Sequence, residues 1–210
     1  MKRKQIQILI IALLLTGCFS IRTPFIPTQY YTLNQQPFSF KNIAELKTFI
    51  LFKDFSVPEE LVENKIMVWF EDGSVQKYNY HRFTTDYPEL INNFIFTRLN
   101  LSKAFKYGIS NSSSTIVPNF ILEGKVFEFR AYSDSKDKSK NWVNVAIQVN
   151  LLKYVPITNQ NKVVLSKVYT QKVERSSREV ATIPQAFSIA LSTIVDKMLI
   201  DLQTATAEAE

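Results

Sequence analysis

The sequence contains few of the residues from which catalytic and metal sites are built. Its 210 residues include one histidine (His81), one cysteine (Cys18) and four glycines. One histidine excludes a histidine-pair metal site, and no G-x-S-x-G motif supplies a nucleophile for a triad around His81. Four separated glycines cannot form a glycine-rich phosphate loop. We therefore expect a protein that is not an enzyme and that holds no metal ion or dissociable cofactor.

Neither sign of charge is in large excess. The chain has 25 Lys and Arg against 19 Asp and Glu, and three of the basic residues stand at positions 2–4. The others are scattered among acids, whereas nucleic-acid-binding proteins gather them on one face. We expect no nucleic-acid partner. Because 46% of the residues are hydrophobic, including sixteen Phe, a packed core does not require disulfides.

The first eighteen residues are organised as a secretory signal peptide. Basic residues 2–4 precede an apolar run over 6–15, about half the length that a membrane-spanning helix needs. The four residues around the cleavage site, Leu15-Thr16-Gly17-Cys18, resemble a bacterial lipobox, with cleavage between Gly17 and Cys18. That resemblance implies a diacylglycerol and an N-acyl chain, such as palmitate, on Cys18. The alternative is an ordinary signal peptide with a chance cysteine at the cut.

The rest of the chain divides into three parts. Residues 18–29 contain two prolines and no periodic pattern, which predicts an extended tether from the acylated cysteine. Residues 30–203 carry strand and helix patterns without a repeat, which predicts a single domain. Residues 204–210 are small and acidic, and we expect a disordered tail.

The residue patterns in the first half of the domain predict strands. Residues 30–33 predict a first strand, and residues 46–55 are apolar on both faces, which predicts a buried central strand. Residues 65–71 and 75–81 flank Asp72-Gly73, which is a strong hairpin signal.

A helix is expected after this hairpin. Asp86 and Glu89 form a capping box, and Pro88 stands in the first turn, where it is tolerated. Apolar residues then recur at helical spacing. Arg98 falls inside the apolar arc, so it should either snorkel or pair with a carboxylate. Phe96 lies on the polar side, where it either packs under a loop or forms an exposed contact.

The second half predicts three strands and a final helix. Residues 119–131, 141–155 and 162–173 should form an antiparallel meander, with a bulge where the parity changes near Gly124. The final helix should begin with a capping box formed by Thr182 and Gln185. Its apolar stripe faces the core, and its opposite face is polar at Ser188, Ser192, Asp196 and Asp201. A membrane-surface helix is the alternative, but the polar face lacks Lys and Arg. The fold class is therefore α+β, with a largely antiparallel mixed sheet and two amphipathic helices packed against it.

The order of these motifs resembles the ABC-type transport auxiliary lipoprotein family, which includes the paraquat-inducible outer-membrane lipoproteins. The lipobox and tether precede Tyr30-Tyr31-Thr32-Leu33, a strand ending in Phe55-Ser56-Val57-Pro58, an aromatic-basic stretch over 78–83, and the helix that starts at Asp86. Family members often have tryptophan where this chain has Phe83. The aromatic character is kept, which favours a packing role.

The resemblance implies a non-catalytic subunit of a trans-envelope lipid transport system. Its partners would be a periplasmic MCE-domain (mammalian cell entry) protein and an inner-membrane ABC permease with its ATPase. Phospholipid would be the cargo, and a partner with rotational symmetry would favour a homo-oligomer. Phe19, in place of the aspartate that retains lipoproteins in the inner membrane, favours the outer membrane, with the domain facing the periplasm. The alternatives are a periplasmic lipid-binding carrier, with an acyl chain between sheet and helices, and a structural or assembly lipoprotein of the envelope.

Overall fold

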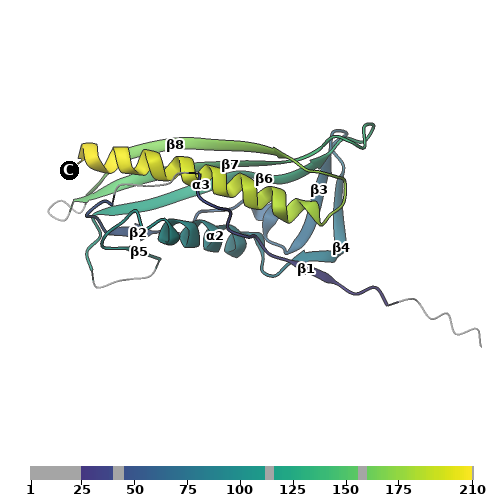
Figure 1. Cartoon of the computed structure of the whole chain (residues 1–210), viewed down its shortest axis with the longest axis horizontal. Coiled ribbons are helices and arrows are strands. Elements are labelled where there is room, and N and C mark those ends of the chain that lie inside the picture. The colour runs from purple at the N-terminus through teal and green to yellow at the C-terminus, as the bar shows by residue number, and fades with distance from the viewer. Residues whose placement is uncertain (1–24, 40–44, 112–115, 156–159, 210) are drawn as a thin grey trace, which may run out of the picture.

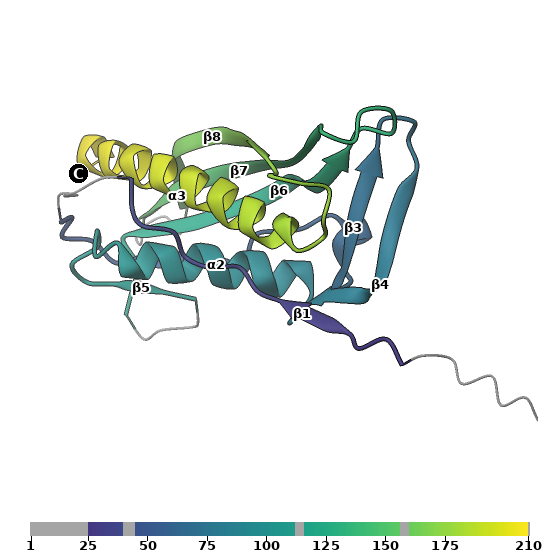
Figure 2. The same ribbon diagram turned by 45° about the vertical axis from the view of Figure 1, so that its right-hand side comes forward.

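The computed structural model describes residues 25–39, 45–111, 116–155 and 160–209. Two long helices, α2 and α3, lie side by side on one face of a mixed eight-stranded sheet (Figures 1 and 2). The predicted α+β class is confirmed. The sheet is built around β6, whose two edges are occupied in different ways.

One edge of β6 carries the predicted meander. β6 (Phe120–Ser133), β7 (Asn141–Val155) and β8 (Gln160–Glu174) pair antiparallel in sequence order. Along β7 the side chains alternate between buried and half-buried, as the sequence predicts. The register shift lies between Val126 and Glu128, a few residues beyond the bulge expected near Gly124. Before Phe127 the even-numbered side chains of β6 face the core, and after it the odd-numbered ones do.

The other edge of β6 is shared by two strands. β2 (Ile50–Phe52) runs parallel to the start of β6, and β3 (Lys65–Phe70) runs parallel to its end. Beyond them, β5 (Ile109–Ser110) pairs with β2, β4 (Val75–Phe83) pairs with β3, and β1 (Gln29–Tyr31) pairs with β4. A short 3-10 helix, η1 (Glu59–Leu61), precedes β3.

The strands β1 to β4 test three of the sequence predictions. The strand expected over 46–55 is central, between β6 and β5, but only Ile50–Phe52 is a strand. The expected hairpin is confirmed, and Gly73 adopts a φ of 82° in its turn. β1 occupies the position expected for the first strand, shifted by one residue at its start.

Helix α2 (Tyr87–Leu101) begins as predicted. The Asp86 carboxylate accepts a hydrogen bond from the Glu89 amide at 3.1 Å, and Pro88 lies in the first turn. Phe96 is half-buried and packs against the core, with its ring centroid 5.7 Å from that of Phe52.

Helix α3 (Thr182–Ala209) differs from expectation at both ends. The Thr182 hydroxyl does not cap the helix but donates to the carbonyls of Ser177 and Glu179. At the other end, the disordered tail predicted from residue 204 is wrong through Ala209, because the helix continues and Ala205 and Thr206 are buried. The apolar stripe there extends the core by another turn.

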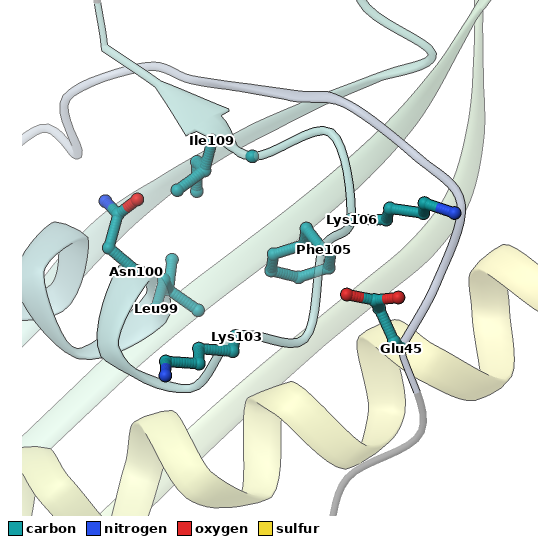
Figure 3. A pocket seen from close by; sticks show the side chains of 8 residues that line it. Glu45, Leu99, Asn100, Lys103, Phe105, Lys106 and Ile109 are labelled. Atoms are coloured by element: carbon teal, nitrogen blue, oxygen red, sulfur yellow. The ribbon is translucent and has the colours of Figure 1, made fainter.

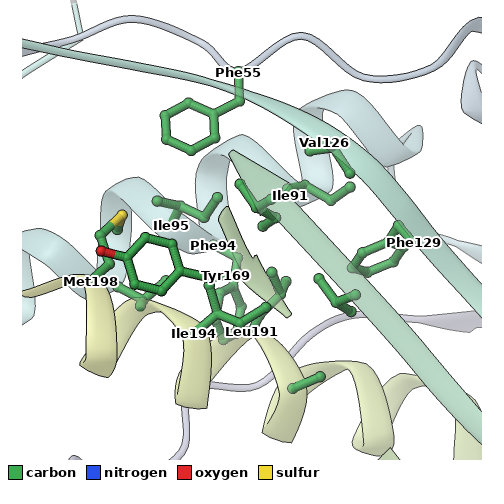
Figure 4. Close-up of a cluster of buried hydrophobic side chains, with 14 of the residues drawn as sticks. Phe55, Ile91, Phe94, Ile95, Val126, Phe129, Tyr169, Leu191, Ile194 and Met198 are labelled. Carbon is green, nitrogen blue, oxygen red and sulfur yellow. The ribbon is translucent and has the colours of Figure 1, made fainter. Parts of the chain in front are cut away.

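The core lies between the helices and the inner face of β6 and β7. Figure 4 shows Ile91, Phe94 and Ile95 of α2 with Leu191, Ile194 and Met198 of α3, beside Val126 and Phe129 of β6. Phe129 stacks on Phe187 with a centroid distance of 3.8 Å. By length and composition α3 could cross a membrane, since its most apolar 18-residue window has a mean hydropathy of 1.3, but 72% of that window is buried. Core packing is confirmed over the surface-helix alternative.

Candidate functional site

The predicted anchor lies outside the described residues. This holds for Gly17 and Cys18, for the predicted signal peptide, and for the tether before Phe25. Residues 25–28 have no regular structure, and the side chains of Phe25 and Ile26 are 90% and 52% exposed. The chain then enters β1, at the end of the molecule opposite the end of α3 (Figure 1).

The single histidine holds β1 against β4. The Tyr31 hydroxyl and His81 Nδ1 are 2.9 Å apart, and the two rings stack with centroids 5.9 Å apart. The Tyr78 ring meets His81 edge-on at 5.8 Å, and burial raises the pKa of Tyr31. His81 therefore joins the first strand to its neighbour.

After β1 the chain runs between the two helices. Figure 2 shows residues 32–39, the interhelical segment, crossing from β1 between α2 and α3. The Asn34 amide donates to Ser188 Oγ of α3, and Gln35 Nε2 donates to the Phe94 carbonyl of α2. The residues that follow β1 are thus fixed to both helices.

A buried ion pair completes this junction. Arg98 Nη2 and Asp196 Oδ1 are 2.6 Å apart, with side chains 1% and 4% exposed. Arg98 also donates to the Gln36 carbonyl at 2.7 Å and lies over the Phe38 ring at 4.3 Å. Asp196 Oδ2 accepts the Ser39 amide at 2.8 Å. The carboxylate pairing expected for Arg98 is confirmed.

The sequence did not identify the partner of Arg98. Ser188, Ser192 and Asp196 were expected on the polar face of α3, opposite the stripe that packs on the core, but all three are buried. Their helical face is covered by α2 and by the interhelical segment, whose irregular backbone brings its own polar groups into the junction. A periodic pattern shows that a face is polar but not that an extended segment covers it.

The described part of the chain contains no group of three metal-binding side chains. The carboxylates of Asp72 and Asp137 accept hydrogen bonds from serines in turns, Ser74 and Ser139, which lower their pKa values. In η1, Glu60 pairs with Arg130 on the surface. These are structural contacts, since none of them brings a base to a nucleophile.

The pockets found among the described residues are open surface features. One of about 280 Å³ lies beyond the end of α2, lined by the apolar Leu99, Phe105 and Ile109 together with the charged Glu45, Lys103 and Lys106 (Figure 3). Larger hollows of about 550 and 520 Å³ lie beside Trp142 and at the end of α3. The hollow at the end of α3 opens between the last turns of that helix and the ends of β7 and β8, outside the part of the core where the side chains of β6, α2 and α3 pack together.

Comparison with known proteins identifies the fold. A crystal structure of a Xanthomonas campestris protein of the DUF330 family matches with a TM-score of 0.74 at 15% identity, covering 87% of this chain and 98% of that one. The structure of an uncharacterised protein matches with a TM-score of 0.61 at 9% identity, covering 84% and 99%. The fold is shared. No family model and no curated protein matches the sequence.

Proposed function

We propose that this chain is a non-catalytic lipoprotein, anchored in the outer membrane through Cys18, that serves an MCE/ABC-type lipid transport system on the periplasmic side. The sequence Leu15-Thr16-Gly17-Cys18, behind a basic start and a short apolar run, is the observation that carries the proposal. Acyl chains supply about 0.8 kcal/mol per buried CH2, and stable anchoring takes more than one chain. A triacylated Cys18 meets that requirement without any membrane-active surface on the domain.

The arrangement of the N-terminal part supports a domain held near the membrane. Residues 19–28 separate Cys18 from β1 and can extend over at most about 35 Å. From β1 onward the chain is fixed by Tyr31 and by the interhelical segment. The folded domain is therefore ordered from β1 onward, and the length of the predicted tether limits how far the domain can stand from the bilayer to meet a partner.

The packed core favours this role over the lipid carrier. A carrier needs a cavity for an acyl chain, and pockets of this kind are typically enclosed and apolar. In the described ranges the space between the sheet and the helices is filled by side chains such as Phe94, Phe129 and Phe187. The resemblance to the auxiliary lipoproteins then favours a transport subunit over a purely structural lipoprotein.

Replacement of Cys18 tests the anchor. Cys18→Ala should abolish palmitate labelling and either release the protein from membranes or leave it with its signal peptide uncleaved. Thr16→Ser is the matched control, because it keeps a small residue beside the cleavage site and should be labelled normally. If Cys18→Ala is still labelled and still fractionates with the outer membrane, the anchor assignment is wrong.

Mild crosslinking in native cells tests the transport role. The full-length protein should capture an MCE-domain protein, and Cys18→Ala should capture less of it because the domain is no longer held at the membrane. Recovery of unrelated envelope proteins alone would contradict the proposal. Phospholipid that co-purifies in stoichiometric amount, apart from the covalent acyl chains, would instead favour the carrier.

A further inference from the structure

Strand β8 forms a long open edge of the sheet. It has 15 residues, runs along one margin of the molecule in Figure 1, and within the described residues pairs only with β7. Helix α3 packs on its inner face, where Lys167 and Tyr169 bind Asp201. Among the described residues no backbone hydrogen bond joins β8 to an element other than β7. The backbone donors and acceptors along its outer edge are therefore available to another strand.

The pairing with β7 shows which residues point to that edge. The amide of Arg175, directly after β8, donates to the Asn141 carbonyl of β7 at 2.8 Å. Successive residues of an antiparallel strand direct their N–H and C=O groups alternately toward and away from the neighbour. Since the register is regular from Glu174 to Leu165, the even-numbered residues direct these groups outward. They are Ser166, Val168, Thr170, Lys172 and Glu174, and all are exposed.

Lysines stand along this edge. The charged residues of β8 are Lys162, Lys167, Lys172 and one acid, Glu174. Of the three lysines only Lys167 has a carboxylate partner among the described residues. Lys197 of α3 adds an ammonium group beside the strand, since its Nζ donates to Gln171 Oε1 at 3.1 Å. The edge is therefore basic on both faces of the sheet.

A second copy of β8 fits this edge poorly. The antiparallel register that places residue 160 opposite residue 174 brings Lys167 against its own copy and Lys162 against Lys172. Like charges directly opposite one another destabilise a sheet, and edge lysines protect against pairing of this kind. The occupant that suits the edge is a strand of opposite charge.

We propose that an extended acidic segment of a partner protein adds to the outer edge of β8 as a further strand. Its backbone supplies affinity by pairing with the outward groups of residues 166–174, as in other cases of strand addition. Its acidic side chains meet Lys172 on the open face of the sheet and Lys197 on the helical face, which selects the partner by charge. Gln171 Nε2 now donates to the outward Lys172 carbonyl at 3.1 Å, and the incoming strand displaces it. The inference does not depend on the proposed anchor or transport role.

Peptide binding to the full-length protein in detergent tests the proposal. The probe is a fluorescent decapeptide of alternating Val and Glu, and the controls are its Val-Lys counterpart and its fully N-methylated form. We expect only the unmethylated Val-Glu peptide to bind. The outward amides of Val168 and Thr170 should then exchange hydrogen more slowly, whereas those of Tyr169 and Gln171, which face β7, should not change. Absence of binding, equal binding of Val-Lys, or equal binding of the N-methylated peptide would overturn the proposal.

A proline in β8 tests the backbone pairing. Thr170→Pro removes one outward N–H, and proline is tolerated in an edge strand where this group faces solvent. The fold should persist by circular dichroism, while the affinity for the Val-Glu peptide falls by about tenfold. Thr170→Val keeps the N–H and should bind as the unmodified protein does. If a folded Thr170→Pro binds equally well, or if it abolishes a self-association of the protein alone, strand addition by an acidic partner is wrong.

Charge reversal tests the choice of partner without a change in the backbone. Lys172→Glu/Lys197→Glu should weaken binding of the Val-Glu peptide by about tenfold or more, because two opposite charges become like charges. Lys106→Glu is the matched control, since this exposed lysine precedes β5, at a different edge of the sheet. It should retain most of the affinity. Unchanged binding by the double variant, or an equal loss with Lys106→Glu, would show that the peptide does not lie along β8.

Discussion

Arg98 of α2 and Asp196 of α3 meet at 2.6 Å in the interior, and between them they fix three segments that are far apart in the sequence. The guanidinium binds the Gln36 carbonyl, while the second carboxylate oxygen accepts the Ser39 amide. The pair thus joins both helices to the interhelical segment, which β1 connects to the predicted membrane tether. A pair that satisfies backbone groups in this way contributes specificity of arrangement as well as energy.

Removal of one charge from the Arg98–Asp196 pair should lower the stability of the fold strongly. Asp196→Asn leaves Arg98 buried without a counter-ion, and we expect the free energy of unfolding to fall by about 3–5 kcal/mol. Urea denaturation followed by circular dichroism measures the change. Asp201→Asn is the control, because its partner Lys167 is half exposed, and it should cost about 1 kcal/mol or less. Equal losses for the two variants would show that Arg98 does not depend on Asp196.

Replacement of both charged residues should restore the free energy of unfolding without restoring the contacts that hold the interhelical segment. In Arg98→Met/Asp196→Leu no buried charge is left unpaired, so the free energy of unfolding should recover to within about 2 kcal/mol of the unmodified protein. The Gln36 carbonyl and the Ser39 amide nevertheless lose their partners. Limited proteolysis should then cut residues 32–39 faster than in the unmodified protein. Unchanged cleavage would mean that other contacts, such as Asn34 with Ser188, suffice to hold the segment.

The sequence predicted most of the secondary structure because its determinants are local. The Asp72-Gly73 turn, the Asp86 cap and the alternation along β7 depend on residues within a few positions of one another. They specify elements whatever lies further along the chain.

The parts that could not be predicted depend on contacts between distant residues. The division of one edge of β6 between β2 and β3, and the burial of Asp196, follow from where the chain passes after folding. Arg175 is a similar case. Its position after a strand reads as ordinary surface, and only its burial beside Ser133 and Asn141 marks it as unusual.

Gly124 should tolerate substitution less well than the glycine of the hairpin. An alanine Cβ at Gly124 would lie 2.5 Å from the Gln148 carbonyl and 2.6 Å from the Phe55 ring, so the backbone must move. We expect Gly124→Ala to cost about 3 kcal/mol. Gly73→Ala meets no atom within 4 Å and is opposed only by its positive φ, which costs about 1–2 kcal/mol. Thermal denaturation of both variants would contradict this if Gly73→Ala were the less stable.

Acid should weaken the contact between α3 and β8. Burial raises the pKa of Asp201, but hydrogen bonds from Lys167 and Tyr169 outweigh it and hold the pKa below its ordinary value. A carboxyl group of this kind stabilises the fold above its unfolded pKa of about 4, and the contribution is lost as the pH falls through the lower, folded value. Urea denaturation between pH 7 and pH 3 should therefore show a shallower acid loss for Asp201→Asn. Parallel profiles for the two proteins would assign the acid sensitivity to other groups.

The last turns of α3 should contribute to stability although their sequence looks like a disordered tail. Ala205 and Thr206 are buried, and Lys153 of β7 donates to the carbonyl of Ala209. Removal of residues 204–210 should therefore lower the free energy of unfolding by about 1–2 kcal/mol, because apolar area of α3 and β7 becomes exposed. Removal of 207–210 alone keeps Ala205 and Thr206 in place and should cost less than half as much. If the two truncations are equally stable, the buried pair contributes nothing, and the helix is held by the turns that precede it.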